Sequence, residues 1–125
     1  MRLAAIDIGS NAVRLIVKEI SGRGETLQVS KVAHTRVPIR LGEDVFVEGA
    51  ISREKEERLA QTLRAFALLM EAMGVKRYRA CATSAMREAK NGAKMAARLA
   101  ESTGIQLELI DGQTEADLIF SNFEV

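Results

Sequence analysis

Near its N-terminus the chain reads Ala5-Ile6-Asp7-Ile8-Gly9-Ser10-Asn11, an apolar run that ends in a carboxylate and is followed by small and polar residues. Runs rich in Ile, Val, Leu and Ala lie on both sides of this polar turn, at residues 3–8 and 13–20. Two such runs around a short turn predict a β-hairpin. Residues 26–36 form a third apolar run, so we expect the chain to start with three antiparallel strands.

The second half of the chain changes to alternating helices and strands. Ser52 stands as a helix N-cap, apolar residues then recur every three or four positions, and Gly74 lies where a left-handed C-terminal cap is expected. Residues 37–50 have no sustained period and are expected to form a loop with one or two short turns. The remaining predicted elements are a strand at 77–82, a helix at 93–102, a strand at 105–110 and a helix at 115–123.

This order of elements predicts an α/β fold with a mixed five-stranded sheet and flanking helices. The three leading strands run antiparallel, whereas the later strands are each reached through a helix and join in parallel. Right-handed crossovers then bring the loops that follow the strands together at one edge of the sheet. The polar residues after each strand are therefore the first candidates for a ligand site.

The size and composition of the chain fit one globular domain. It has 125 residues, of which 47% are hydrophobic and 28% charged, with a net charge of +1. Nucleic-acid binding is disfavoured because basic residues are not in excess and aromatic residues for stacking are few. A single cysteine fits a reducing compartment, and no segment has the length of a membrane span or the layout of a signal peptide. The cytoplasm is the expected location.

The first candidate ligand site is the turn that follows residues 3–8. Successive backbone N–H groups in such a turn can cradle a phosphate, and Gly9 would let the backbone come close to it. Ser10 and Asn11 add short polar side chains, and Asp7 could hold Mg²⁺ directly or through water. Alternatively, Gly9 and Asn11 serve only the geometry of a hairpin turn.

Two further candidates follow the later strands. Thr83 and Ser84 leave the preceding strand and could either cap the turn or contact a ligand, and the planar guanidinium of Arg87 suits phosphate oxygens. Arg87 could equally be a surface residue or a neighbour of Glu88. Glu115 lies at the next strand-to-helix junction, where it could position or deprotonate an attacking water. Acids are also favoured at that position by the helix dipole alone.

Other polar residues have ordinary structural interpretations. Cys81 is expected to be a packed core thiol without a catalytic role. His34 lies on a predicted edge strand and is not expected to bind a metal. The charged run at residues 53–58 has opposite charges at helical spacing, and we interpret it as a solvated helix face that needs no partner.

Three segments, taken together and in this order, resemble the exopolyphosphatase and guanosine-pentaphosphate phosphohydrolase (Ppx/GppA) family. They are Ala5-Ile6-Asp7-Ile8-Gly9-Ser10-Asn11, Ala82-Thr83-Ser84-Ala85-Met86-Arg87-Glu88-Ala89 and Ile110-Asp111-Gly112-Gln113-Thr114-Glu115-Ala116-Asp117-Leu118-Ile119. Arg40-Leu41-Gly42 also resembles that family's short motif after the third strand. The resemblance spans essentially the whole chain, with departures at Val13-Arg14, Asp111 and Thr114.

The resemblance implies an actin-like, ribonuclease-H-like fold in which two lobes close around the terminal phosphates of a substrate. Residues 1–125 would be the first, N-terminal lobe. The resemblance assigns phosphate binding to Gly9, Ser10 and Asn11, proximity to the metal to Asp7, the grip on the terminal phosphoryl group to Arg87, and activation of water to Glu115.

The implied reaction is the attack of water on a terminal phosphoanhydride of inorganic polyphosphate, guanosine pentaphosphate or both, with Mg²⁺ and arginine neutralising charge. No second phosphate loop of the Asp-x-Gly-Gly-Gly-Ser type precedes Val125. We therefore expect a truncated chain that is inactive by itself, and a homodimer for the full-length protein. Two alternatives stay open, namely an actin-like kinase or ATPase lobe, and a module that binds polyphosphate or an alarmone nucleotide without cleaving it.

Overall fold

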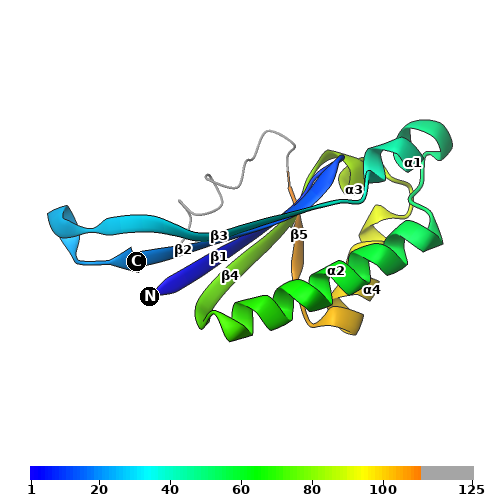
Figure 1. Ribbon diagram of the computed structural model, residues 1–125. Helices are drawn as coiled ribbons and strands as arrows, with labels where there is room; N and C mark the ends of the chain where they lie inside the picture. Colours follow the sequence, from blue (N-terminus) through cyan, green and yellow to red (C-terminus); the bar gives the residue numbers. More distant parts are fainter. Residues whose placement is uncertain (111–125) are drawn as a thin grey trace.

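The strands form one mixed sheet in the order β3-β2-β1-β4-β5 (Figure 1). The computed structural model describes residues 1–110, so the predicted helix at 115–123 lies outside the described residues. β1 pairs antiparallel with β2 and β2 with β3, whereas β4 runs parallel to β1 and β5 parallel to β4. The predicted mixed five-stranded sheet is confirmed. The elements are β1 (Arg2–Ile8), β2 (Ala12–Ser21), η1 (Gly24–Thr26), β3 (Gln28–Pro38), α1 (Leu41–Glu48), α2 (Arg53–Ala72), β4 (Val75–Ala82), α3 (Ser84–Glu88), α4 (Gly92–Thr103) and β5 (Leu107–Leu109).

The helices α2 and α4 lie together on one face of the sheet (Figure 1). Three apolar side chains of α2, Leu59, Leu63 and Phe66, are buried there at the three- and four-residue spacing that puts them on one side of a helix. Alternate residues of β1, such as Ala4 and Ile6, belong to the same core. None of the helices within residues 1–110 is long and apolar enough to cross a membrane.

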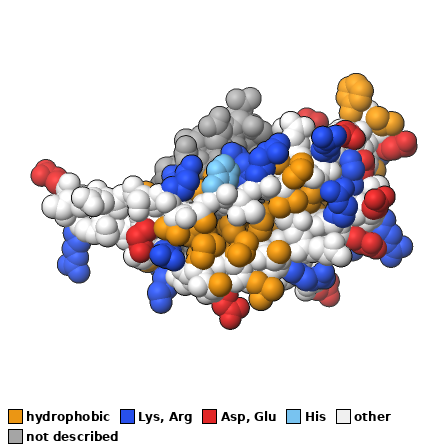
Figure 2. Space-filling view, in the orientation of Figure 1, with side chains coloured by type: hydrophobic (Ala, Val, Ile, Leu, Met, Phe, Trp, Pro, Cys, Tyr) orange, Lys and Arg blue, Asp and Glu red, His pale blue; other side chains and the backbone are white. Residues whose placement is uncertain are grey.

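Hydrophobic side chains gather on the surface between α2 and β3, as Figure 2 shows. A groove of about 330 Å³ runs there, with Val37 on its β3 side and Ala65 and Leu69 on its α2 side. β3 is an edge strand, and it extends to Pro38 because an edge position tolerates a residue without a backbone donor. His34 lies on this edge strand, as predicted.

The helix α2 begins and ends at the capping residues that the sequence predicts, and α4 ends in the same way. Ser52 Oγ accepts a hydrogen bond from the backbone N–H of Lys55 (3.3 Å), which satisfies one of the open amides at the start of α2. Gly74 follows α2 with φ 68°, and Gly104 follows α4 with φ 77°. Both angles lie in the left-handed region that glycine adopts without strain, so local capping chemistry sets the length of these helices.

The segment predicted as a loop, residues 37–50, contains the helix α1. Leu41 is fully buried, but Phe46 and Val47 are 92% and 73% exposed, so α1 lacks the apolar period that identifies a helix in a sequence. The chain enters α1 at Arg40, which has φ 59° and ψ 50°. Arg40 is the only non-glycine residue within residues 1–110 with a positive φ, a conformation that neighbouring contacts must hold.

Candidate functional site

The turn between β1 and β2 is closed by a backbone hydrogen bond from the Gly9 N–H to the Ala12 carbonyl oxygen (2.9 Å). Neither Gly9 nor Asn11 has a positive φ. A Cβ added at Gly9 would meet only the Ala12 oxygen, at 3.4 Å, which is close to an ordinary contact. The geometry of this hairpin turn therefore does not require glycine at position 9.

The segment that enters α1 packs directly against this turn. The Gly42 N–H donates to the Ser10 carbonyl oxygen (2.8 Å), and the Arg40 N–H donates to the Asn11 carbonyl oxygen (2.9 Å). A Cβ on Gly42 would lie 3.0 Å from the Cβ of Ser10, closer than side chains normally approach. The Arg40-Leu41-Gly42 motif therefore braces the turn, and glycine at position 42 makes the close approach possible.

These hydrogen bonds also decide where the amide groups of the turn point. The carbonyl and the following N–H of a trans peptide point in opposite directions, so anchoring the Ser10 oxygen at Gly42 directs the Asn11 N–H away from Gly42. Within residues 1–110, the N–H groups of Ser10 and Asn11 donate no hydrogen bond. Adjacent open amides on a turn are suited to bind an anion.

The end of β4 is tied to the end of β1. The N–H and the hydroxyl of Thr83 both donate to the Ile8 carbonyl oxygen, at 3.0 and 3.4 Å, and Thr83 is buried. Thr83 is the N-cap residue of α3, but its hydroxyl makes no cap hydrogen bond. Ser84 begins α3 and is half-buried. The loop after β4 thus starts beside the β1–β2 turn, as the parallel pairing of these strands predicts.

Arg87 lies in the last turn of α3 and is exposed. Its backbone N–H donates to the Thr83 carbonyl oxygen (3.1 Å), which ties the short helix to the end of β4. Its guanidinium forms no ion pair with Glu88 or with any other residue in the described part of the chain. Arg87 is therefore a cation available to a ligand on a helix anchored next to the turn.

Asp7 precedes the turn and is only 8% exposed. One oxygen of its carboxylate accepts a hydrogen bond from Arg14, its cross-strand neighbour on β2. The described residues contain no cluster of three or more His, Cys, Asp or Glu side chains that could hold a metal ion. Mg²⁺ needs only one or two protein carboxylates when phosphates and waters complete its shell, so Asp7 fits as one ligand of such an ion.

Cys81 lies beside Asp7 in the register of β1 and β4, and it is buried. Burial and then the nearby Glu108 carboxylate raise the pKa of its thiol to about 11. The thiol therefore stays protonated at neutral pH, which makes it a poor nucleophile. The prediction of a packed core thiol is confirmed.

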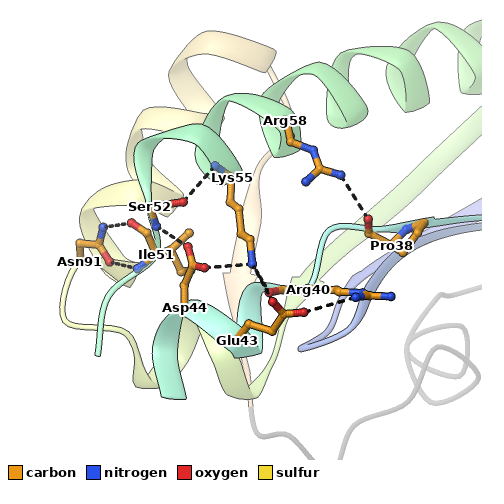
Figure 3. Close-up of polar contacts among 9 residues, drawn as sticks. All are labelled: Pro38, Arg40, Glu43, Asp44, Ile51, Ser52, Lys55, Arg58 and Asn91. Atoms are coloured by element: carbon orange, nitrogen blue, oxygen red, sulfur yellow. Dashed lines mark hydrogen bonds and ion pairs between the residues drawn. The ribbon is translucent and has the colours of Figure 1, made fainter. Parts of the chain in front are cut away.

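The charged run at residues 53–58 is mostly exposed, but three of its side chains also contact other segments of the chain. Lys55 reaches the Arg40 carbonyl oxygen (2.7 Å), Arg58 reaches the Pro38 carbonyl oxygen (3.4 Å), and Arg98 of α4 binds Glu56 (2.7 Å) (Figure 3 shows the first two). The predicted solvated face is therefore confirmed for most of the run, whereas the contacts with other segments could not be predicted, because charge spacing shows only contacts along one helix.

Glu115, the predicted catalytic glutamate, and the motif around it lie outside the described residues. Of the predicted site residues, the structure therefore brings together Asp7, the turn at residues 9–11, Thr83 and the helix that carries Arg87.

The model of the Ppx/GppA phosphatase family matches residues 16–123. The chain belongs to this family. Exopolyphosphatase 1 of Mycobacterium tuberculosis and that of Mycobacterium leprae are each 32% identical to it over 120 residues, which cover 96% of this chain and 34% of those proteins. This Ppx/GppA chain thus spans about a third of the length of these relatives, and the resemblance inferred from its three motifs is confirmed.

Solved structures of Ppx/GppA proteins agree with this assignment. The Aquifex aeolicus family member matches with a TM-score of 0.82 at 32% identity, covering 89% of this chain and 35% of that one. An exopolyphosphatase from Cytophaga hutchinsonii matches with a TM-score of 0.82 at 28% identity, covering 96% of this chain and 37% of that one. The sheet and its helices therefore have the actin-like ATPase fold of the Ppx/GppA family.

Proposed function

We propose that this chain forms part of the active site of a phosphoanhydride hydrolase that releases terminal phosphate from inorganic polyphosphate, guanosine pentaphosphate or both. The observation that carries the proposal is a pair of N–H groups, at Ser10 and Asn11, and a guanidinium, at Arg87, that have no partner within residues 1–110. Both lie on segments that hydrogen bonds hold at the same edge of the sheet. Membership of a phosphatase family supports hydrolysis. The mycobacterial relatives, which are exopolyphosphatases, support polyphosphate as a substrate.

In this mechanism the turn binds phosphate oxygens through the N–H groups of Ser10 and Asn11. Arg87 holds the terminal phosphoryl group and stabilises the charge on its oxygens while water attacks in line. The bond from the water oxygen to phosphorus forms as the bond to the bridging oxygen breaks, and the electron pair leaves with the shortened phosphate chain. Glu115 is proposed to orient the water and to accept its proton.

We propose Asp7 as the residue that holds Mg²⁺, directly or through water. Its second carboxylate oxygen accepts no hydrogen bond from a described residue, so it is open to such a ligand. A bound Mg²⁺ supplies positive charge to the phosphate oxygens. Arg14 fixes the rotamer of Asp7 from the neighbouring strand, which keeps the carboxylate in place before the ion binds.

The test is the substitution Arg87→Ala in the natural protein at its full length, with phosphate release measured on both substrates. We expect turnover to fall by roughly 10²- to 10⁴-fold, and Glu115→Gln to have a similar effect. The control is Arg64→Ala, which removes an exposed arginine from a different helix, α2, and should leave turnover unchanged. Turnover of Arg87→Ala within a few-fold of the natural protein would remove Arg87 from the mechanism.

A second candidate is a module that binds polyphosphate or an alarmone nucleotide without cleaving it. The N–H groups of Ser10 and Asn11, which donate no hydrogen bond within residues 1–110, would serve such a module as well as a hydrolase. Tight binding of polyphosphate to residues 1–125 without phosphate release would support it. We propose instead that this part alone binds weakly and is inactive, which clear Mg²⁺-dependent phosphate release from it would contradict. Phosphorylation of an acceptor by ATP would favour the kinase alternative.

A further inference from the structure

The ammonium group of Lys55 contacts the Arg40-Leu41-Gly42 segment, which packs against the β1–β2 turn. Its side chain is only 16% exposed, although lysine is among the residue types most often found on the surface. It donates a hydrogen bond to the Arg40 carbonyl oxygen (2.7 Å) and lies 2.9 Å from Asp44 Oδ1 (Figure 3). Two of its three N–H donors are therefore used inside the protein.

Asp44, the partner of Lys55, is itself fixed. Its Oδ2 accepts a hydrogen bond from the Ser52 backbone N–H (2.8 Å), at the start of α2. Burial acts to raise the pKa of this carboxyl, but hydrogen bonds from Lys55 and Ser52 outweigh it and hold the pKa below its ordinary value. The carboxylate therefore stays ionised at neutral pH and keeps the ammonium of Lys55 in one place.

The carbonyl that Lys55 holds belongs to the residue with the unfavourable left-handed backbone. Arg40 lies between two peptide groups. The N–H of the first donates to the Asn11 carbonyl, and the carbonyl of the second accepts from Lys55 (2.7 Å) and from the Glu43 N–H (3.2 Å). Fixing both groups keeps φ at 59°. Lys55 is thus connected to the turn through two hydrogen bonds and one strained residue, although it does not contact the turn itself.

We propose that Lys55 is a positioning residue for the phosphate turn. By holding the Arg40 carbonyl, it sets the place of the Arg40 and Gly42 amides, and these fix the carbonyls of Ser10 and Asn11 and so the direction of the open amides. The inference rests on the proposed function, because it assumes that this turn binds phosphate. A purely structural role, in which Lys55 only links α1 to α2, would leave the turn unaffected.

The experiment compares Lys55→Met with Arg98→Met in the natural protein at its full length. Methionine keeps the apolar stem of lysine and removes its donors. Arg98→Met is the matched control, since it breaks an ion pair between α4 and α2 (2.7 Å) that has no connection to Arg40. Asp44→Asn, which can still accept from Ser52, provides the same test if Lys55→Met does not fold.

The first measurement is hydrogen exchange in a peptide that covers residues 39–43, because its amides at positions 40 and 42 bond to the turn. We expect roughly tenfold faster exchange there in Lys55→Met, with β4 unchanged, and no change at residues 39–43 in Arg98→Met. The second is phosphate release from polyphosphate, for which kcat should fall by about tenfold or more in Lys55→Met alone.

Equal exchange at residues 39–43 in both variants overturns the inference. So does faster exchange in Lys55→Met with unchanged kcat, provided that Arg87→Ala abolishes phosphate release. If the natural protein itself releases no phosphate, the proposed function has failed, and the exchange data then show only that Lys55 orders the segment around Arg40. Faster exchange together with a lower kcat supports the proposal.

Discussion

The turn between β2 and β3 and the turn between β1 and β2 both contain glycine, but for different physical reasons. Gly22, in the first, has φ 83°, and a Cβ there would lie 2.2 Å from the Thr26 carbonyl oxygen. The backbone thus demands glycine at that position. Gly9, in the second, has no positive φ and has room for a Cβ. The fold therefore does not require glycine at position 9, which is consistent with the proposed close approach of a phosphate there.

The surroundings of the two turns differ as well. The β2–β3 turn lies at the tip of a long hairpin that projects beyond the helices (Figure 1). Its hydrogen bonds are internal, such as the one from the Leu27 N–H to the Gly24 carbonyl oxygen (3.1 Å). The β1–β2 turn instead receives donors from Arg40 and Gly42 of another segment. The β2–β3 turn thus depends only on its own geometry, whereas the β1–β2 turn, which we propose binds phosphate, is held by a neighbouring segment.

Among the changes that test this comparison, Gly9→Ala is expected to have the largest effect. The added methyl group fits the folded chain but occupies space next to the open amides, so turnover should fall by about 100-fold. The free energy of unfolding should change by less than about 0.5 kcal/mol. Phosphate release and urea denaturation of the same preparation check both halves. Turnover close to that of the natural protein would contradict the proposal that Gly9, unlike Gly22, serves a ligand.

Gly42→Ala is expected to have the next largest effect and to lower both turnover and stability. Its Cβ would push against Ser10, displacing the turn or the start of α1. We expect turnover about tenfold lower, since small misplacements of binding groups slow a reaction. We also expect about 1–2 kcal/mol lower stability from the crowded contact. The same two assays apply, and a variant as stable and active as the natural protein would show that the turn is not braced here.

Gly22→Ala should affect stability alone. Forcing a side chain into its positive φ and against Thr26 should destabilise the fold by about 1–3 kcal/mol. Turnover per folded molecule should be unchanged, because the β2–β3 turn lies at the other end of β2 from the site. Active-site titration alongside thermal unfolding separates the two quantities. A loss of turnover that exceeds the unfolded fraction would contradict the comparison.

The smallest effect is expected from pH. A hydrogen bond from Arg98 is the main cause that lowers the pKa of Glu56, and the pKa of Asp44 is also lowered. A lowered pKa means that the stabilisation is fully present above the unfolded pKa of about 4 and is lost as pH falls through the lower folded values. Urea midpoints between pH 7 and pH 3 should therefore fall less steeply for Asp44→Asn than for the natural protein.

The sheet and the two long helices could be predicted from the sequence because their signals are local. Apolar runs between polar turns mark the strands, and Ser52 with Gly74 marks the ends of α2. α1 was missed because Phe46 and Val47 are exposed, and one buried leucine makes no period. Helix recognition by periodicity works only when a helix buries a full face.

The candidate site was predictable to the extent that strand order determines it. Residues that follow parallel strands meet at one sheet edge, and Thr83 indeed bonds to the carbonyl of Ile8. Lys55 could not be predicted, because its partner Arg40 lies before α2 and adopts a backbone conformation that no sequence pattern signals for arginine. The brace of the turn depends on such contacts between distant segments.

The central position of β1 has a consequence for the order of folding. Its pairing with β2 joins neighbours in the chain, and hairpins of this kind form within microseconds. Its pairing with β4, where Leu3 meets Arg77, requires closure of a long loop that includes α1 and α2, which is slower. During synthesis the β1–β2 turn therefore forms before β4, the strand that Thr83 follows, has left the ribosome. The proposed capacity to bind an anion is therefore acquired late in the biogenesis of this chain, after its hairpin has already formed.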